Sequence, residues 1–183
     1  MLQHKGTQRL ETERLILRPF RLDDAESMFN NWAKDPEVTK YLTWQPYSGV
    51  ETANEILSIW TKEYEKKDFY QWAIELKELG QPIGSISVVE QKKKARVAHI
   101  GYCLGLEWWH KGIMSEALKA VMDFLFDEVG FNRIESRHDP RNPNSGKVMI
   151  KCGMKYEYTM RQSDWNNQGI CDASWYALLK SER

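Results

Sequence analysis

The first third of the chain carries one strand-like and two helix-like hydrophobic patterns. Residues 11–18 (ETERLILR) place Leu15 and Leu17 on one face and Ile16 on the other, just before Pro19, which predicts a short strand. Apolar residues then recur at helical spacing over residues 23–36 and again over 53–64, and the turn-rich residues 41–49 between them predict a loop. Residues 1–10 have no such pattern and predict a short flexible leader.

Further along the chain the pattern changes to a period of two. Residues 70–76, 82–90 and 96–104 predict three consecutive strands, and the lysine-rich turn between the last two is interpreted as a solvated turn without a function. A helix is expected over 112–129, a strand over 132–138 and a short helix over 143–152. Two last strands, 155–162 and 172–180, flank a polar loop at 163–169. Hairpins followed by a strand–helix–strand unit predict a mixed α/β (α+β) sheet of about seven strands with four helices, in one domain spanning residues 11–183.

Composition narrows the class of protein. The chain has 183 residues, of which 42% are hydrophobic, which is enough for a substantial core. Its 26 basic and 26 acidic residues balance, whereas proteins that bind nucleic acids usually carry a basic surplus, so we expect no nucleic-acid partner.

The same reasoning bears on the compartment. No apolar run approaches the roughly 18 residues of a membrane span and the start lacks a secretory pattern, so we expect neither membrane insertion nor export. Cys103, Cys152 and Cys171 form an odd set without a CxxC pair, which favours reduced thiols in a cytoplasm and no metal site.

The most informative stretch runs from the strand at 96–104 into the helix that begins at Gly112. A glycine delivered to a helix N-terminus leaves backbone N–H groups free, which suits a pyrophosphate, and His110 and Lys111 could add positive charge at its rim. A single glycine before a helix is also a common structural feature. The stretch has neither the Gly-Lys-Ser/Thr ending of a P-loop nor the three spaced glycines of a dinucleotide fingerprint.

Four segments together resemble one known family. Residues 109–114 (WHKGIM) are similar to the Gln/Arg-x-x-Gly-x-Gly/Ala motif of the GNAT acetyltransferases, although Trp109 and Met114 depart from it. Residues 12–29, 98–126, 142–161 and 172–180 resemble, in order and spacing, the RimJ/RimL branch, which contains the ribosomal-protein-alanine N-acetyltransferases. The resemblance covers residues 12–180 and implies the GNAT acyl-CoA N-acyltransferase fold.

The resemblance also implies a binding site for acetyl-CoA as co-substrate. Its pantetheine arm would pair with the strand end at Tyr102, Cys103 and Leu104, as an added strand would. Its pyrophosphate would bind the backbone amides of Trp109, His110, Lys111, Gly112, Ile113, Met114 and Ser115. Asn142 matches a cofactor-contacting asparagine of the family, and a simple helix cap is the other interpretation of that residue.

Catalytic roles follow from the same comparison. His99 stands where many relatives carry a glutamate, so it is the candidate general base, with a satisfied interior histidine as the alternative. Met149 occupies the position of the family's acid tyrosine, which leaves Ser145 as the candidate proton donor to the thiolate. Cys103 could suggest an acetyl-enzyme, but no Cys–His arrangement is evident, so direct transfer is favoured.

The acceptor is expected to bind between Trp44, Tyr47 and Trp165, although surface packing would also explain these aromatic residues. A weak base can deprotonate an α-amino group of pKa about 8 more readily than a lysine of pKa about 10.4. This difference favours a peptide or protein N-terminus as the acceptor. The alternatives are a small amine such as a polyamine or aminoglycoside, and a non-catalytic acyl-CoA-binding module. The sequence leaves open whether the protein is a monomer or a homodimer.

Overall fold

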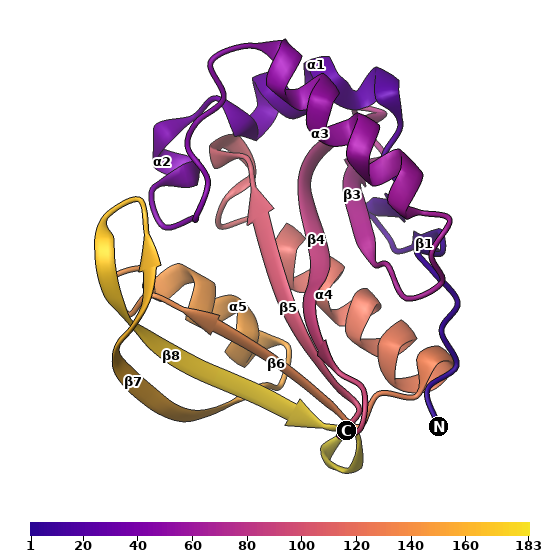
Figure 1. Cartoon of the computed structure of the whole chain (residues 1–183), viewed down its shortest axis with the longest axis vertical. Coiled ribbons are helices and arrows are strands. Elements are labelled where there is room, and N and C mark those ends of the chain that lie inside the picture. Colours follow the sequence, from indigo (N-terminus) through magenta and orange to yellow (C-terminus); the bar gives the residue numbers. More distant parts are fainter.

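The computed structural model describes residues 1–183 and forms one eight-stranded sheet in the order β1-β2-β3-β4-β5-β6-β8-β7 (Figure 1). The strands are β1 (Leu10–Glu11), β2 (Leu15–Arg18), β3 (Gln71–Leu76), β4 (Gln81–Lys92), β5 (Val97–Leu104), β6 (Arg133–His138), β7 (Lys155–Asn166) and β8 (Gly169–Leu179). All neighbours pair antiparallel except β5 and β6, which are parallel because α4 (Ile113–Phe124) crosses over between them.

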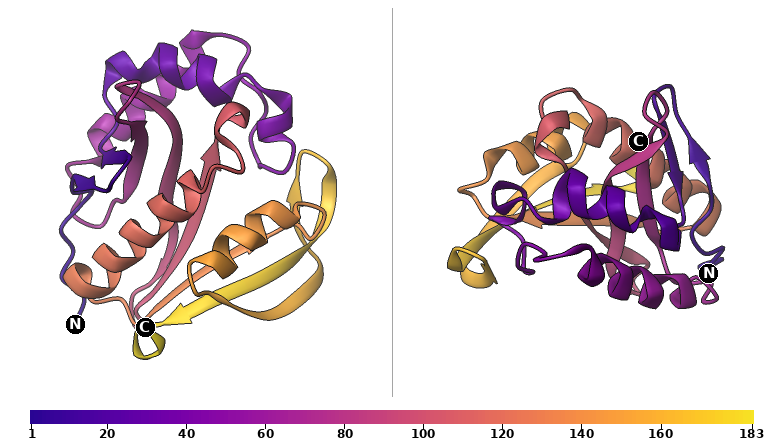
Figure 2. Two further views of the ribbon diagram at one scale, coloured as in Figure 1. Left: turned by 180° about the vertical axis from the view of Figure 1, so that it is seen from behind. Right: turned by 90° about the horizontal axis from the view of Figure 1, so that it is seen from above.

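Helices cover both faces of the sheet. On one face, α1 (Ala25–Met28), α2 (Pro36–Thr39) and α3 (Val50–Glu63) lie over the N-terminal half, and the view from behind shows α4 and α5 (Pro143–Lys151) on the other face (Figure 2). A core cluster of 27 buried residues lies mainly between the sheet and α4. A second cluster of nine lies under α1 and α3. No helix combines the length and the apolar composition that a membrane span requires.

The parallel pair β5–β6 is short. Its register holds only for Val97↔Arg133, Ala98↔Ile134 and His99↔Glu135, after which the two strands diverge into the V visible in Figure 1. At the branch point the buried Ser136 Oγ donates to Ile100 O at 2.8 Å. The open V divides the sheet into an N-terminal and a C-terminal half, and it is where the candidate site lies.

The predicted elements are recovered with specific differences. The strand expected over 11–18 is two strands joined by a turn, in which Thr12 Oγ1 accepts from Leu15 N at 3.0 Å. The helix expected over 23–36 is a succession of a 3₁₀ turn, α1 and a π-helical stretch at Phe29–Ala33. The fold therefore has eight strands instead of about seven, and α2 is an additional short helix.

Two segments, residues 163–166 and residues 1–10, differ from the structure that the sequence predicts. Residues 163–166, expected to be loop, belong to β7, and the turn between β7 and β8 is only Asn167–Gln168. The pattern misled because Ser163, Asp164 and Asn166 are residue types common in turns, and the pairing with β8 has a register irregularity between Met160 and Asp164. Residues 1–10, expected to be flexible, are held by hydrogen bonds such as Gln3 N to Val129 O at 2.8 Å and Gly6 N to Lys67 O at 2.7 Å.

Candidate active site

The open edge of β5 forms the floor of the site. On one side β5 pairs with β4 as far as Leu104, whereas on the other side its pairing with β6 ends at His99. Residues 101–104 therefore present one strand edge without a partner strand, as an extended ligand would need for main-chain pairing. Tyr102, Cys103 and Leu104, the expected pantetheine-binding residues, all lie on this edge.

The loop after β5 turns the chain into α4 and leaves a run of amides free. Trp109 Nε1 donates to Leu104 O at 2.7 Å and so ties the loop to the strand end. His110 (φ 60°) and Gly112 (φ 74°) both adopt left-handed backbone conformations. The first backbone N–H of α4 with an acceptor in the chain is that of Glu116, which donates to Gly112 O, so the N–H groups of residues 110–115 are unused. Of the expected pyrophosphate-binding residues, His110 to Ser115 thus form one cluster of free donors at a helix N-terminus, whereas the backbone N–H of Trp109 already donates to Leu106 O at 3.2 Å.

Two cationic side chains that the sequence analysis missed lie over this cluster. A methyl group placed on Gly112 would be 3.4 Å from Lys151 Nζ at the end of α5 and 3.7 Å from Arg14 Nη2 before β2. Arg14 is fixed by Glu116, whose Oε2 accepts from Arg14 Nε at 2.7 Å, and by Lys111 O, which accepts from Arg14 Nη1 at 2.9 Å. Glu116, in the first turn of α4, already balances the charge of Arg14, whereas Lys151 forms no ion pair. The positive charge of Lys151 opposes the helix dipole and is favourable there only when an anion binds.

The gap between β5 and α5 is bridged by two hydroxyl groups. Tyr102 OH donates to Ser145 O at 2.9 Å, and Ser145 Oγ donates to Tyr102 OH at 3.3 Å. Burial raises the pKa of Tyr102 above its ordinary value, so the phenol is neutral. Met149, one helical turn after Ser145, is fully buried in the core. Asn142 lies at the N-cap position of α5, but its side chain makes no capping bond and its amide stays available.

Because side chains alternate along a strand, His99 and Tyr102 lie on opposite faces of β5. The His99 side chain is only 6% exposed. Burial, reinforced by the nearby positive charge of Arg137, lowers the pKa of His99 to about 4. Arg137 Nη1 donates to His99 Nε2 at 3.4 Å, which puts the ring proton on Nδ1, where no acceptor is present. The imidazole is therefore neutral at pH 7, with its lone pair facing a guanidinium.

Around His99 the charged groups of this face are already paired. Arg137 Nε donates to Asp164 Oδ2 at 2.5 Å, and its guanidinium lies 5.3 Å from the ring centre of Trp175. The neighbouring buried carboxylate, Glu135, accepts from Arg133 Nε at 2.8 Å and from Lys92 Nζ at 3.3 Å. The face beside His99 consequently offers aromatic surface and balanced charge.

The expected acceptor residues are brought together only in part. Trp44 and Tyr47 pack on each other with ring centres 5.2 Å apart, and burial raises the pKa of Tyr47 to about 12, with Cys103 as a second cause. These two residues therefore lie beside the end of β5. Trp165 is 57% exposed, and because strand neighbours point to opposite faces, it points away from the face on which Asp164 meets Arg137.

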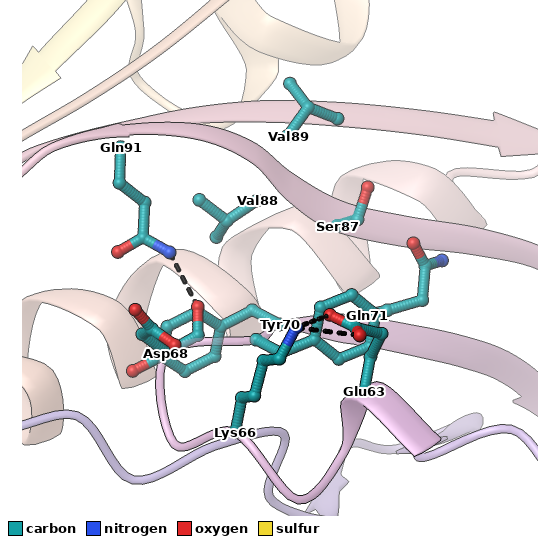
Figure 3. Close-up of a pocket in the computed structure, with 10 residues that line it drawn as sticks. Glu63, Lys66, Asp68, Tyr70, Gln71, Ser87, Val88, Val89 and Gln91 are labelled. Carbon is teal, nitrogen blue, oxygen red and sulfur yellow. Dashed lines mark hydrogen bonds and ion pairs between the residues drawn. The ribbon is translucent and has the colours of Figure 1, made fainter. Parts of the chain in front are cut away.

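A cleft of about 430 Å³ lies elsewhere, between the end of α3, the following loop and β4 (Figure 3). None of the residues expected in the site lines it. Its carboxylates are occupied: Glu63 accepts from Lys66 Nζ at 2.6 Å and Asp68 from Lys93 Nζ at 2.8 Å. We assign this cleft no role in the chemistry.

The cysteine thiols do not form a nucleophilic site. Cys103 Sγ lies 3.4 Å from Ser85 Oγ, and burial raises the pKa of its thiol, which disfavours the thiolate needed for an acetyl-enzyme. Burial likewise raises the pKa of Cys152 to about 11. No cluster of three or more histidine, cysteine, aspartate or glutamate side chains has a metal-binding arrangement.

Taken together, a strand edge that opens at a V, a helix N-terminus with free amides and cations beside it define the class of acyl-CoA-dependent transferases. Comparison with known proteins supports this class. The pattern described as "Acetyltransferase (GNAT) domain" matches residues 14–155. The chain belongs to the GNAT family of acetyltransferases and is an acetyl-CoA-dependent N-acetyltransferase.

Two sequence relatives and one solved structure show what this chain is similar to. An uncharacterized N-acetyltransferase of Bacillus licheniformis, p20, is 32% identical over 94% of this chain and 97% of its own length. The [ribosomal protein uS5]-alanine N-acetyltransferase of Escherichia coli is 24% identical over 87% of both chains. The microcin C7 self-immunity acetyltransferase MccE, solved with acetyl-CoA and AMP, has a TM-score of 0.82 at 18% identity, covering 92% of this chain and 93% of its own.

Proposed function

We propose that this protein transfers the acetyl group of acetyl-CoA to the α-amino group at the N-terminus of a peptide or protein. The observation that carries the proposal is the run of unused N–H groups at residues 110–115 beside the open edge of residues 101–104. The helix N-terminus suits the pyrophosphate of acetyl-CoA and the strand edge suits its pantetheine arm, so the residues present fit the co-substrate.

The neighbourhood of His99 supports an α-amino acceptor over a lysine. With a pKa of about 4, His99 is a weak base, so a substantial fraction of the acceptor amine must already be deprotonated in solution before it reacts. At pH 7.5 an α-amino group is about 25–40% neutral, whereas a lysine is only about 0.1% neutral. The similarity to a ribosomal-protein-alanine N-acetyltransferase points in the same direction.

The residue roles proposed for the reaction are these. The neutral amine attacks the thioester carbonyl, a C–N bond forms, the C–S bond breaks, and the amine releases a proton while the thiolate gains one. Ser145, in contact with the Tyr102 hydroxyl, is the proposed donor toward the thiolate. His99 remains the proposed base, but its Nε2 already accepts from Arg137, so the proton must leave through a water or after that contact breaks. Trp44 and Tyr47 are the proposed acceptor-binding residues, and Trp165, on the other face, is not retained among them.

The two alternatives make different demands on the protein. A polyamine or aminoglycoside acceptor is cationic and would favour unpaired carboxylates near the thioester. Asp164 and Glu135, the carboxylates beside His99, are both paired with arginine. A non-catalytic acyl-CoA-binding module would keep the free amides but would not release thiol in the presence of any acceptor.

The test is an acceptor panel with free-thiol detection. The decisive pair is one peptide with a free N-terminus and no lysine, and the same peptide acetylated at its N-terminus with one lysine added. We expect thiol release with the first peptide and little with the second. Release only with polyamines or aminoglycosides would establish the small-amine alternative, and tight acetyl-CoA binding without release over the whole panel would establish the binding module.

A further inference from the structure

The tip of the β7–β8 hairpin is joined to the loop after α2 through a single residue. Asn167 Nδ2 donates to Thr39 O at 2.9 Å and to Trp44 O at 2.8 Å. Its Oδ1 accepts from Gln45 Nε2 at 2.6 Å, and its backbone N donates to Leu42 O at 3.1 Å. Both polar atoms of the side chain are thus used to hold a segment more than 120 positions away in the sequence.

The preceding residue holds the same tip to the C-terminal half of the molecule. Asn166, which is buried, donates from Nδ2 to Asp139 Oδ2 at 2.9 Å. Although burial disfavours its charged form, hydrogen bonds from Arg141 and Asn166 hold the pKa of Asp139 at about 2, so it accepts as a carboxylate. Asp139 lies in the connection that leads from β6 to Asn142 and α5.

These contacts lie across the open end of the V. Figure 1 shows the hairpin tip next to α2, on the side where β5 and β6 are far apart, and Figure 2 shows the same contact from behind. At the closed end the two halves of the sheet are joined by three residue pairs and by Ser136. Asn166 and Asn167 join them again at the other end.

We propose that Asn167 is a positioning residue for the acceptor. By holding the carbonyl groups of Thr39, Leu42 and Trp44, it places the loop that carries Trp44 and Tyr47 at a set distance from the C-terminal half of the site. Asn167 does not touch the open β5 edge or the amides of residues 110–115, so its role is separate from cofactor binding. This inference rests on the proposed function, because it presumes that the acceptor binds against this loop.

The variant Asn167→Ala tests the proposal, and Gln168→Ala is the matched control because Gln168 is exposed in the same turn and its side chain makes no hydrogen bond. We expect Asn167→Ala to raise KM for the acceptor peptide about 10-fold, the factor that corresponds to one net hydrogen bond of loop positioning. Acetyl-CoA Kd should stay within a factor of about two, as expected for a residue outside that site. Gln45→Ala, which removes one of the four contacts, should give a smaller rise in KM.

Hydrogen exchange supplies a readout that does not depend on activity. Amides of residues 39–47 should exchange faster in Asn167→Ala than in the parent or in Gln168→Ala, while amides of α4 keep their exchange rates. Unchanged exchange in residues 39–47 would overturn the inference, as would faster exchange with an unchanged acceptor KM.

If the parent protein acetylates no amine at all, the proposed function fails and the acceptor role with it, whereas the exchange result still decides whether Asn167 holds the loop. A general loss of exchange protection would show a folding defect, and Asn167→Asp, which keeps the Gln45 contact, then replaces the alanine variant.

Discussion

Burial determines what the imidazole of His99 can do. In the folded protein its pKa is about 4, whereas in the unfolded chain it should return to about 6.5. Between these values the unfolded chain binds a proton that the folded protein does not. The free energy of unfolding therefore falls as the pH is lowered from about 6.5 to about 4, and is unaffected by His99 above that window.

This linkage predicts a pH-dependent loss of stability that a substitution removes. We expect the parent protein to lose up to about 3 kcal/mol between pH 7 and pH 4 through His99, and His99→Gln to lack that component. Urea unfolding at several pH values measures it. The pKa of His4 is also lowered, but His4 is present in both proteins, so the difference between them isolates His99. Parallel stability curves would contradict the low pKa of His99.

Lys151 is a second residue whose charge should have opposite effects on co-substrate binding and on the stability of the unliganded protein. Its ammonium lies over Gly112 at the N-terminus of α4, where the helix dipole repels it, and Lys151 forms no ion pair. Removing the charge should therefore weaken binding of the anionic co-substrate and at the same time stabilise the unliganded protein slightly.

The corresponding variant is Lys151→Gln, with Lys147→Gln on an exposed position of the same helix as the control. We expect acetyl-CoA Kd to rise about 3- to 10-fold at low salt, with a smaller effect at high salt, and the free energy of unfolding to rise by about 0.3–1 kcal/mol. Isothermal titration calorimetry and urea unfolding measure the two effects. An equal loss of affinity in both variants would point to general surface charge instead of a phosphate contact.

At the scale of elements, the N-terminus of α4 depends on one backbone conformation. Gly112 has a φ of 74°, which costs a residue with a Cβ atom about 1–2 kcal/mol. Gly112→Ala should therefore destabilise the protein by about that amount and should also displace the N–H groups that follow it. Acetyl-CoA binding should weaken more than the stability loss alone explains.

Gly80 provides the control for Gly112. It has a φ of 62° in the turn between β3 and β4, and a Cβ there would meet no atom within 4 Å. Gly80→Ala should show a similar loss of stability in thermal unfolding with unchanged acetyl-CoA affinity. If Gly112→Ala binds acetyl-CoA as tightly as Gly80→Ala does, the amides of residues 110–115 do not form the pyrophosphate site.

Local patterns predicted the elements whose hydrophobic period is set by one buried face. The strands at 70–76, 82–90 and 96–104 match β3, β4 and β5 closely, and the helix expected over 112–129 is α4 continued by a π-helical stretch at Leu125–Val129. Each of these elements packs on the main core. Residues 163–166 were assigned to a loop because Ser163, Asp164 and Asn166 are residue types common in turns, and the strand continues past a register irregularity between Met160 and Asp164. The divergence of β5 from β6 could not be predicted either, because it depends on pairing between segments that are distant in the sequence.

The site follows the same division. The amides of residues 110–115 could be predicted because one contiguous stretch supplies them. Arg14, Lys151 and Asn167 could not, since each reaches the site from a distant segment and no local pattern marks it. The low pKa of His99 was also out of reach, because it depends on burial and on Arg137 from the neighbouring strand. The position of Trp165 on a strand, and so the face to which it points, was likewise not predicted.

At the scale of the whole molecule, the divergence of β5 from β6 divides the sheet into two halves that share few main-chain pairs. Strands β1–β5 and β6–β8 share only three residue pairs, and the other connections include α4, Ser136, the His99–Arg137 and Lys92–Glu135 contacts and the hairpin tip. A ligand that lies in the V and contacts β5, α4 and α5 together adds contacts between the two halves. It should therefore stabilise the entire fold, and not only the loop that it touches.

This coupling predicts the response of thermal unfolding to acetyl-CoA. At about 100 times its Kd, a ligand that binds only the folded state adds about 2.7 kcal/mol, which for a chain of this size raises Tm by about 5–10 °C. Spermidine at the same concentration should leave Tm unchanged, because the carboxylates near His99 are paired. Asn167→Ala should keep the full acetyl-CoA shift from a lower starting Tm, since that residue joins the halves without contacting the cofactor loop. A protein whose Tm does not respond to saturating acetyl-CoA would not bind it in the V, whereas loss of the shift in Asn167→Ala alone would mean that the hairpin tip and the co-substrate close the V together.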